Sequence, residues 1–300
     1  MPNLPRALPE LDFENRRVET SDRVSLAVQV TGSGPSVLLA NGIGVTRPGL
    51  DFLAGHLASS FQVICWDYRG AGESRLDSTR TDLSIERHAL DAREILEDLG
   101  VRRAAVLGWS MGVPVGLELI RSAPEMVAGF GALFGAAGRP FEAGFGAPLA
   151  RLVHLSVAGL ARAPAPGQLA LDAAVALPSV AWALLTTVGF VGPGAHRENF
   201  DYNVRSVANA DRRAYFTTLL ALSAHDAHDV LPGMRCPALV VAGKKDPLTP
   251  VSAARRMVQS LPDAELVVLP DASHFGVIEH GPALWEPIDR LLHRAFHGAA

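Results

Sequence analysis

At the point that decides its fold, the chain reads Val106-Leu107-Gly108-Trp109-Ser110-Met111-Gly112. Gly-x-Ser-x-Gly directly follows an apolar run that favours a strand, and a helical pattern of apolar residues runs on to Ile120. A serine in a sharp strand-to-helix turn exposes its hydroxyl, and the flanking glycines are needed because a β-carbon there would clash. The N-terminus of the following helix also favours developing negative charge. Ser110 is therefore the candidate nucleophile, and a purely structural turn is the alternative interpretation.

Outward from this stretch, short apolar runs alternate with helical patterns. This rhythm predicts an α/β fold with a mostly parallel central sheet and helices on both faces. One helix is expected to begin after the N-cap Ser84 and to end before Gly100. Later helices are expected over residues 251–261 and 283–296. The predicted strands cover residues 24–30, 36–40, 62–66, 104–107, 238–242 and 265–269.

The rhythm breaks between residues 138 and 210, a segment rich in Ala, Leu, Gly and Pro without clear strands. We therefore predict a core of residues 1–137 and 211–300 with a helical cap inserted at 138–210. The cap has more large apolar side chains than a small lid can bury on one face, so part of it is expected to line a substrate pocket. Trp182 is the candidate substrate contact in the cap, and Trp109 is the candidate in the core. Simple packing within the cap and docking on a lipid surface are the alternatives.

The base and the acid are expected in loops that follow strands. A serine hydroxyl needs an adjacent base, and in this arrangement the order along the chain is Ser, then Asp or Glu, then His. His274 follows the last predicted strand, and Asp246 follows the strand before it. Asp246 precedes a proline and is also compatible with a plain turn. The alternative acids are Asp226, Asp229 and Asp271.

Composition excludes several classes of function. The 300 residues carry a net charge of −4 without a basic block, so no nucleic-acid partner is expected. Cys65 and Cys236 lie in strand-like runs and are expected to be buried thiols, compatible with a reducing compartment. The N-terminal residues lack an apolar signal-like segment, so a cytoplasmic location is expected. Residues 173–195 contain no charge, but Pro and Gly interrupt them, and a span there would separate Ser110 from Asp246.

No metal and no organic cofactor are expected. His225 and His228 are spaced as metal ligands can be, but the sequence offers no clear third ligand near them. The glycine-rich stretches lack the patterns that bind dinucleotides or nucleoside phosphates. The oligomeric state is left open by the sequence.

Four blocks of sequence resemble the α/β-hydrolase superfamily. They are residues 41–44, residues 67–74, the turn at Ser110, and the loops of Asp246 and His274 with Glu279 and Pro282. The resemblance covers residues 18–135 and 211 to the C-terminus. It implies an oxyanion hole formed by the backbone N–H groups of Ile43 and Met111. The chain departs from the pattern at Asn41, where many relatives have histidine.

Together these observations predict a serine hydrolase that cleaves small apolar carboxylic esters. Ser110 would attack the carbonyl carbon, His274 would take its proton, and Asp246 would orient the imidazole. A lactonase or a carbon–carbon bond hydrolase would use the same three residues, and residues 41–44 also resemble those of enol-lactone hydrolases. A non-catalytic ligand receptor on a hydrolase scaffold is the alternative from another class.

Overall fold

A computed structural model describes residues 11–76, 82–192 and 194–298. Within these residues, one sheet has the strand order β1-β2-β4-β3-β5-β6-β7-β8. Strands β3 to β8 run parallel, whereas β2 pairs antiparallel with both β1 and β4. The strands are β1 (Glu14–Glu19), β2 (Ser25–Thr31), β3 (Ser36–Ala40), β4 (Gln62–Trp66), β5 (Ala104–Trp109), β6 (Val127–Leu133), β7 (Ala238–Gly243) and β8 (Ala264–Leu269).

The six predicted strands are confirmed, and the sequence reading missed β1 and β6. Strand β1 is a charged edge in which only Val18 is buried, a composition that discourages pairing with other chains. Strand β6 contains Gly129 and Gly131, which weaken a strand signal. Both glycines allow close packing: a β-carbon on Gly129 would lie 2.8 Å from Cβ of Ala295, and one on Gly131 would press on Leu107.

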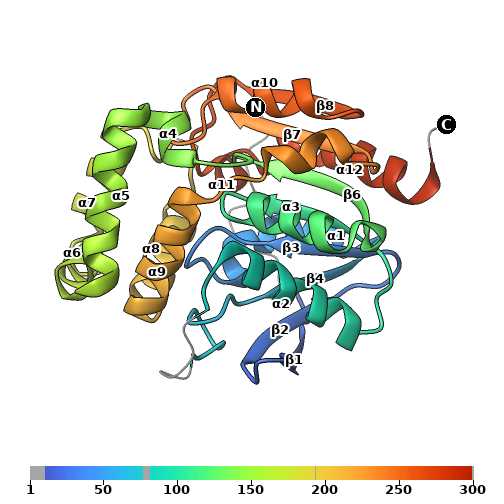
Figure 1. Ribbon diagram of the computed structural model, residues 1–300, viewed down its shortest axis with the longest axis horizontal. Coiled ribbons are helices and arrows are strands. Elements are labelled where there is room, and N and C mark those ends of the chain that lie inside the picture. Colours follow the sequence, from blue (N-terminus) through green and yellow to red (C-terminus); the bar gives the residue numbers. More distant parts are fainter. Residues whose placement is uncertain (1–10, 77–81, 193, 299–300) are drawn as a thin grey trace.

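Helices cover both faces of the sheet (Figure 1). The helix that begins after Ser84 is confirmed, because Ser84 Oγ accepts a hydrogen bond from the Arg87 N–H and Gly100 adopts a φ of +69° at the end. One face holds α2 (Ile85–Asp98), α3 (Gly112–Ser122) and α10 (Val251–Ser260), and the other holds α1 (Asp51–Leu57) and α12 (Gly281–His297). The short elements are α11 (Gly276–Glu279) and the 3-10 helices η1 (Arg47–Leu50), η2 (Pro124–Met126) and η3 (His228–Gly233).

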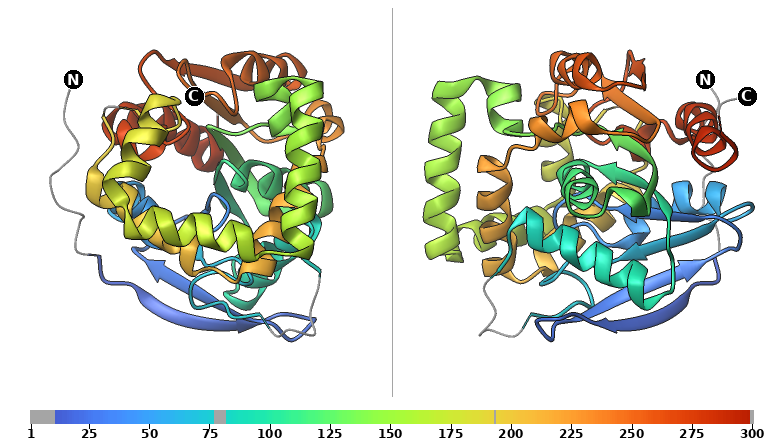
Figure 2. Two further views of the ribbon diagram at one scale, coloured as in Figure 1. Left: turned by 90° about the vertical axis from the view of Figure 1, so that its left-hand side faces the viewer. Right: turned by 45° about the vertical axis from the view of Figure 1, so that its right-hand side comes forward.

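A group of helices covers the end of the sheet at which the parallel strands finish (Figures 1 and 2). These helices are α4 (Pro140–Phe145), α5 (Ala147–Arg162), α6 (Ala165–Ala176), α7 (Pro178–Thr187), α8 (Arg197–Asn209) and α9 (Arg212–Ala224).

The chain enters and leaves this group at one narrow neck. Gly138 forms a β-bridge with Asp226, and the Arg139 N–H donates to the His225 carbonyl at 2.8 Å. Helix α9 also packs against α5. This pairing supports an insertion that runs from Gly138 to His225, so the return that the sequence placed near Asp211 falls inside it. We refer to residues 138–225 as the cap.

A cluster of charged side chains surrounds Arg69, a residue of the 67–74 block that lies beneath the cap. The Arg69 guanidinium is fully buried and forms ion pairs with Asp22 and Asp91. His88 is also fully buried, with its ring edge-on to Tyr68 at 5.0 Å between centroids. Burial, with a further contribution from the positive charge of Arg69, lowers the pKa of His88 to about 3. His88 is therefore neutral in the folded protein.

We expect His88 to make the protein sensitive to acid. The unfolded chain binds a proton at this histidine below about pH 6.5, and the folded chain does so only below about pH 3. The free energy of unfolding should therefore fall as the pH drops through this window, by about 3 kcal/mol from this group between pH 7 and pH 4.5. Urea unfolding of wild type and His88→Gln near pH 7 and pH 4.5 measures this. A variant that loses as much stability on acidification as wild type would contradict the prediction.

Candidate active site

Ser110 lies in the strained turn between β5 and α3. Its φ is +53°, in the left-handed region that residues with side chains rarely adopt. A β-carbon on Gly108 would clash with the carbonyl oxygen of Gly112, and one on Gly112 would clash with that of Ala40. Both glycines are therefore required by the close packing of this turn, for the reason that the sequence suggested.

The structure brings Ser110, His274 and Asp246 into one chain of hydrogen bonds. His274 Nε2 lies 2.9 Å from Ser110 Oγ, and His274 Nδ1 lies 2.9 Å from Asp246 Oδ2. The three residues follow β5, β8 and β7, whose carboxyl ends meet at one edge of the sheet. His274 and Asp246 are both buried. This arrangement can remove a proton from the serine hydroxyl and stabilise the resulting imidazolium.

The alternative acids have other partners. Asp226 binds His228 and Arg139, and Asp229 binds Arg121. Asp271 pairs with Lys245 at the surface. The geometry therefore favours Asp246 as the partner of His274.

The Asp246 carboxylate is held by its own loop. Oδ1 accepts hydrogen bonds from the backbone N–H groups of Leu248 and Thr249, and Oδ2 accepts one from Thr249 Oγ at 2.6 Å. Burial raises the pKa of Asp246, but its interactions with His274 and Thr249 outweigh burial and hold the pKa below its usual value. The sequence analysis did not single out Thr249. A turn in which an aspartate accepts hydrogen bonds from the N–H groups two and three residues later is nevertheless common.

Glu279 joins the histidine loop to the cap. Its buried carboxylate accepts hydrogen bonds from the N–H groups of Ser273 and Gly192, at 2.9 and 2.6 Å. The Ser273 hydroxyl donates to Glu279 and lies 2.9 Å from the Phe190 carbonyl oxygen. The sequence analysis named Glu279 only as part of the block around His274 that resembles the superfamily. Its contacts indicate that it positions the residue before His274 against the cap segment that follows α7.

The loop after β3 lies beside the serine. Ile43, Ser110 and Met111 line the same cavity, and within the described residues neither the Ile43 nor the Met111 backbone N–H donates to another group. Both are therefore available to a carbonyl oxygen. Asn41 is buried, and its side-chain amide has no partner among the described residues. The Tyr68 hydroxyl instead holds this loop by donating to the Asn41 carbonyl at 3.0 Å.

Ser110 and His274 open into a cavity of about 460 Å³ between the core and the cap. Its walls are almost entirely apolar and, among the described residues, contain no Asp, Glu, Lys or Arg side chain. All six helices of the cap, α4 to α9, contribute large apolar side chains. They include Phe141, Val157, Leu171, Leu185 and Tyr215.

The two predicted tryptophan contacts differ in outcome. Trp109 lines the cavity, and its Nε1–H donates to the His274 carbonyl at 3.1 Å. Trp182 is not part of the cavity wall. Its ring packs edge-on against Phe200, with 5.0 Å between centroids, and Phe200 is the residue that lines the cavity. The expectation of direct substrate contact by Trp182 is therefore corrected to a supporting position behind Phe200.

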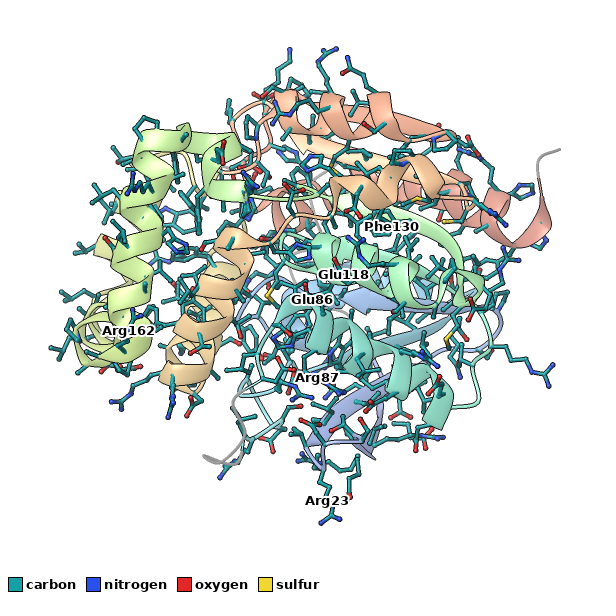
Figure 3. All side chains as sticks on the ribbon, viewed as in Figure 1. Arg23, Glu86, Arg87, Glu118, Phe130 and Arg162 are labelled. Atoms are coloured by element: carbon teal, nitrogen blue, oxygen red, sulfur yellow. The ribbon has the colours of Figure 1, made fainter. Side chains whose placement is uncertain are left out.

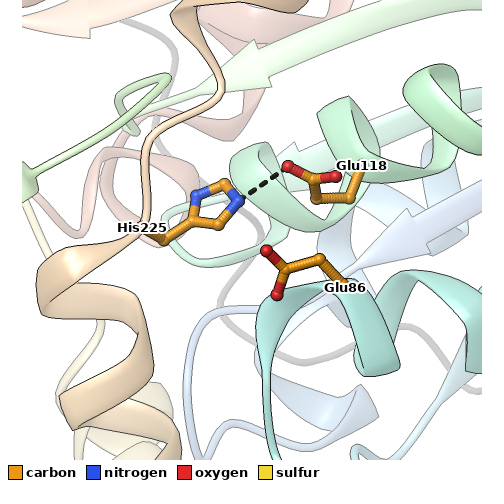
Figure 4. Close-up of side chains that lie close together, drawn as sticks. All are labelled: Glu86, Glu118 and His225. Carbon is orange, nitrogen blue, oxygen red and sulfur yellow. Dashed lines mark hydrogen bonds and ion pairs between the residues drawn. The ribbon is translucent and has the colours of Figure 1, made fainter.

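A second group of polar residues lies at the neck of the cap. Figure 3 labels Glu86 on α2 and Glu118 on α3, and Figure 4 shows both beside His225 at the end of α9. Their potential metal-ligating atoms lie within 4.8 Å of one another. His228, the partner suggested by spacing, is instead bound to Asp226.

This group already has a simpler role. His225 Nε2 lies 2.8 Å from Glu118 Oε1, and Arg121 donates to Glu118 Oε2 at 2.8 Å. Burial raises the pKa of Glu118, but these hydrogen bonds outweigh burial and lower it. We interpret the group as a hydrogen-bonded network that links the end of α9 to α3, with an ion pair between Arg121 and Glu118. That the protein needs no metal remains a prediction.

The uncharged segment of the cap forms parts of two helices. Among the described residues, no single helix is long and apolar enough to cross a membrane. Helices α6 and α7 meet that apolar criterion only when taken together, and the chain bends by 105° between them.

Comparison with known proteins places these features in a family. The model of the alpha/beta hydrolase family matches residues 37–286. The chain belongs to the alpha/beta hydrolase family.

Similar curated proteins include an uncharacterized hydrolase, YraK, of Bacillus subtilis, which is 36% identical over 33% of this chain and 36% of its own length. The chain thus matches only about a third of the length of the first curated relatives. A 3-oxoadipate enol-lactonase of Acinetobacter baylyi is 25% identical over 85% of this chain and 88% of its own length. Activity and substrate are therefore matters for a proposal.

Solved structures share the fold over nearly the whole chain. A thermophilic esterase from Thermogutta terrifontis superimposes with a TM-score of 0.77 at 23% identity, covering 94% of this chain and 99% of that one. An enol-lactonase from Burkholderia xenovorans gives a TM-score of 0.69 at 22% identity, with 92% and 99% covered. At these identities the similarity establishes the fold.

Proposed function

We propose that the protein hydrolyses small, uncharged, apolar carboxylic esters through an acyl-enzyme. The observation that carries this proposal is the hydrogen-bonded chain of Asp246, His274 and Ser110 at the floor of an apolar cavity. A charge on the substrate would be desolvated in such a cavity without a partner, which costs several kcal/mol. Uncharged acyl groups are therefore the substrates that the cavity fits.

The reaction follows from the roles of the three side chains. Ser110 Oγ attacks the ester carbonyl carbon while His274 Nε2 takes the hydroxyl proton. The N–H groups of Ile43 and Met111 stabilise the negative charge on the carbonyl oxygen, each by several kcal/mol. His274 returns the proton to the leaving alcohol, which departs and leaves an ester between the acyl group and Ser110. Water then attacks this ester with His274 again as base, releasing the acid and restoring the serine.

Asp246 stays ionised throughout these steps. Its carboxylate holds the proton of His274 on Nδ1, so that Nε2 is free to accept the serine proton. The three hydrogen bonds from its own loop keep Oδ2 directed at the imidazole.

A lactonase is the second candidate, because a lactone is an internal ester and needs the same groups. The similarity to the Acinetobacter baylyi enol-lactonase over most of both chains favours it. A panel of p-nitrophenyl esters and uncharged lactones, assayed with wild type and Ser110→Ala, separates the two activities. Binding of these compounds without any turnover would support the receptor alternative and contradict the proposal.

We expect kcat/KM to rise with acyl chain length until the cavity is full. Each buried methylene contributes about 0.8 kcal/mol, or about fourfold. Val157→Phe narrows the cavity from α5 and should lower kcat/KM about tenfold for long acyl chains while sparing acetate esters. Val175→Phe is the matched control, because Val175 lies on the exposed side of α6 and outside the cavity wall. A flat chain-length series, or equal loss at every length, would contradict this role of the cavity.

A further inference from the structure

Most of the large hydrophobic residues that are exposed in the described part of the chain lie on the cap. Of the ten large hydrophobic residues that are exposed in the described part of the chain, nine lie between residues 149 and 188. The tenth is Leu90 on α2. We call these nine residues the cap patch, and their side chains reach 70% exposure at Leu169. The cap patch consists of Leu149, Leu152, Leu155, Leu169, Val175, Leu177, Val180, Leu184 and Val188.

The same three helices are apolar on their inner sides as well. Val157 of α5, Leu171 of α6 and Leu185 of α7 line the cavity. A helix that is apolar all round is normally buried or in contact with lipid. Figure 2, left, shows that α5, α6 and α7 instead frame one side of the molecule. The outer faces of these helices therefore expose an unusual number of large apolar side chains to water.

The few charges of this segment indicate which partner fits it. The Asp, Glu, Lys and Arg residues between positions 146 and 188 are Arg151, Arg162 and Asp172 alone. This segment therefore carries a net charge of +1, whereas the whole chain carries −4. Asp172 is already engaged by Gln168 at 2.6 Å, and both arginines are exposed. Protein interfaces usually have a polar rim and about one hydrogen bond per 100–200 Å². This segment has few polar groups that could form such a rim or such hydrogen bonds. A lipid surface needs neither, and exposed arginines favour an anionic one.

The bend between α6 and α7 determines how such contact is made. Together they are apolar enough for a membrane span, but the 105° change of direction prevents them from crossing as one helix. They can instead lie along the boundary between headgroups and acyl chains, where amphipathic elements bury apolar side chains.

We propose that the cap patch docks the protein on an anionic lipid surface, with α5, α6 and α7 lying in the headgroup region. The inner faces of these helices form the cavity wall, so docking places the cavity beside a source of apolar molecules. The docking itself does not depend on the proposed esterase function, because it rests on the outer surface of the cap.

The test measures binding of the whole chain to vesicles by co-sedimentation, without turnover. Vesicles of equal parts phosphatidylcholine and phosphatidylglycerol are expected to bind the wild type. The double variant Leu152→Glu with Leu155→Glu should bind at least about tenfold more weakly, since it removes two apolar groups and adds negative charge. Leu90→Glu is the matched control and should bind like wild type. Circular dichroism confirms that all three are folded.

The contribution of charge is tested separately. Arg151→Gln and Arg162→Gln should each weaken binding to the mixed vesicles about fivefold, with little effect on vesicles of phosphatidylcholine alone. Equal binding to both vesicle types would contradict the proposal that the cap patch prefers an anionic lipid surface. Binding that the leucine variants leave unchanged would overturn docking through the cap patch. Absence of vesicle binding, with self-association that the leucine variants abolish in light scattering, would identify a second copy of the chain as the partner and overturn the proposal.

Discussion

Ser110→Ala is expected to lower kcat/KM for p-nitrophenyl esters by about 10⁴-fold or more. The hydroxyl is the only group of the hydrogen-bonded chain that faces the cavity as a nucleophile, and the acyl-enzyme cannot form without it. Residual catalysis would come from the backbone donors and from substrate positioning. Initial rates with purified wild type and variant, at matched concentrations, measure the loss.

The serine variant needs a control for folding and for specificity. Ser122→Ala changes a serine at the other end of α3, whose hydroxyl donates to backbone carbonyls of that helix, and it should keep full activity. Labelling by a fluorophosphonate should disappear in Ser110→Ala and persist in Ser122→Ala. A Ser110→Ala protein that keeps more than roughly a hundredth of the wild-type rate would show that another nucleophile performs the reaction.

Most strands and helices of the core could be predicted because each is encoded by a short continuous stretch of sequence. The apolar run before Ser110, the two glycines and the helix after them are one continuous segment, and the structure reproduces it. Strand β6 was missed because its glycines look unfavourable until the close packing of α12 is known. That packing joins residues more than a hundred positions apart, which no local pattern contains.

In the candidate site, too, the residues encoded by local sequence were predicted, and those that depend on distant contacts were not. The positions of Asp246 and His274 after strands predicted that they would lie near Ser110, since parallel strands end at one edge. Glu279 was not recognised as a link to the cap, because its bond to Gly192 depends on how the cap folds back. Trp182 was misplaced because α7 is apolar on all sides, and its sequence does not indicate which side faces the cavity.

The end of the cap differs between the sequence pattern, which places it near Ala210, and the backbone pairing, which supports a later boundary. Helix α9 begins after the N-cap Asp211, as the core helix α2 begins after Ser84, so in the sequence the rhythm of the core resumes at its start. The backbone pairing of Gly138 with Asp226 occurs only after this helix. A neck formed by two distant segments becomes visible only in three dimensions.

Asp246→Asn is expected to lower kcat by about 10³- to 10⁴-fold with little change in the fold. The asparagine NH₂ group can donate to His274 Nδ1, which would place the imidazole proton on Nε2. In that tautomer Nε2 donates to Ser110 Oγ and cannot accept its proton. The loop would keep part of its structure, because the N–H groups of Leu248 and Thr249 can still donate to the remaining oxygen.

The test compares Asp246→Asn with Asp226→Asn and Asp271→Asn, which change carboxylates bound to other partners at the surface. Single-turnover measurements separate the acylation rate from substrate binding, and the loss should lie in acylation while the apparent affinity stays near that of wild type. A tautomer effect also predicts that fluorophosphonate labelling of Ser110 slows in Asp246→Asn, because that reaction too requires proton transfer to His274. If Asp226→Asn slowed both reactions and Asp246→Asn slowed neither, Asp226 would be the acid and the loop after β7 would have only a structural role. The 2.9 Å contact between Asp246 Oδ2 and His274 Nδ1 leads us to expect the opposite result.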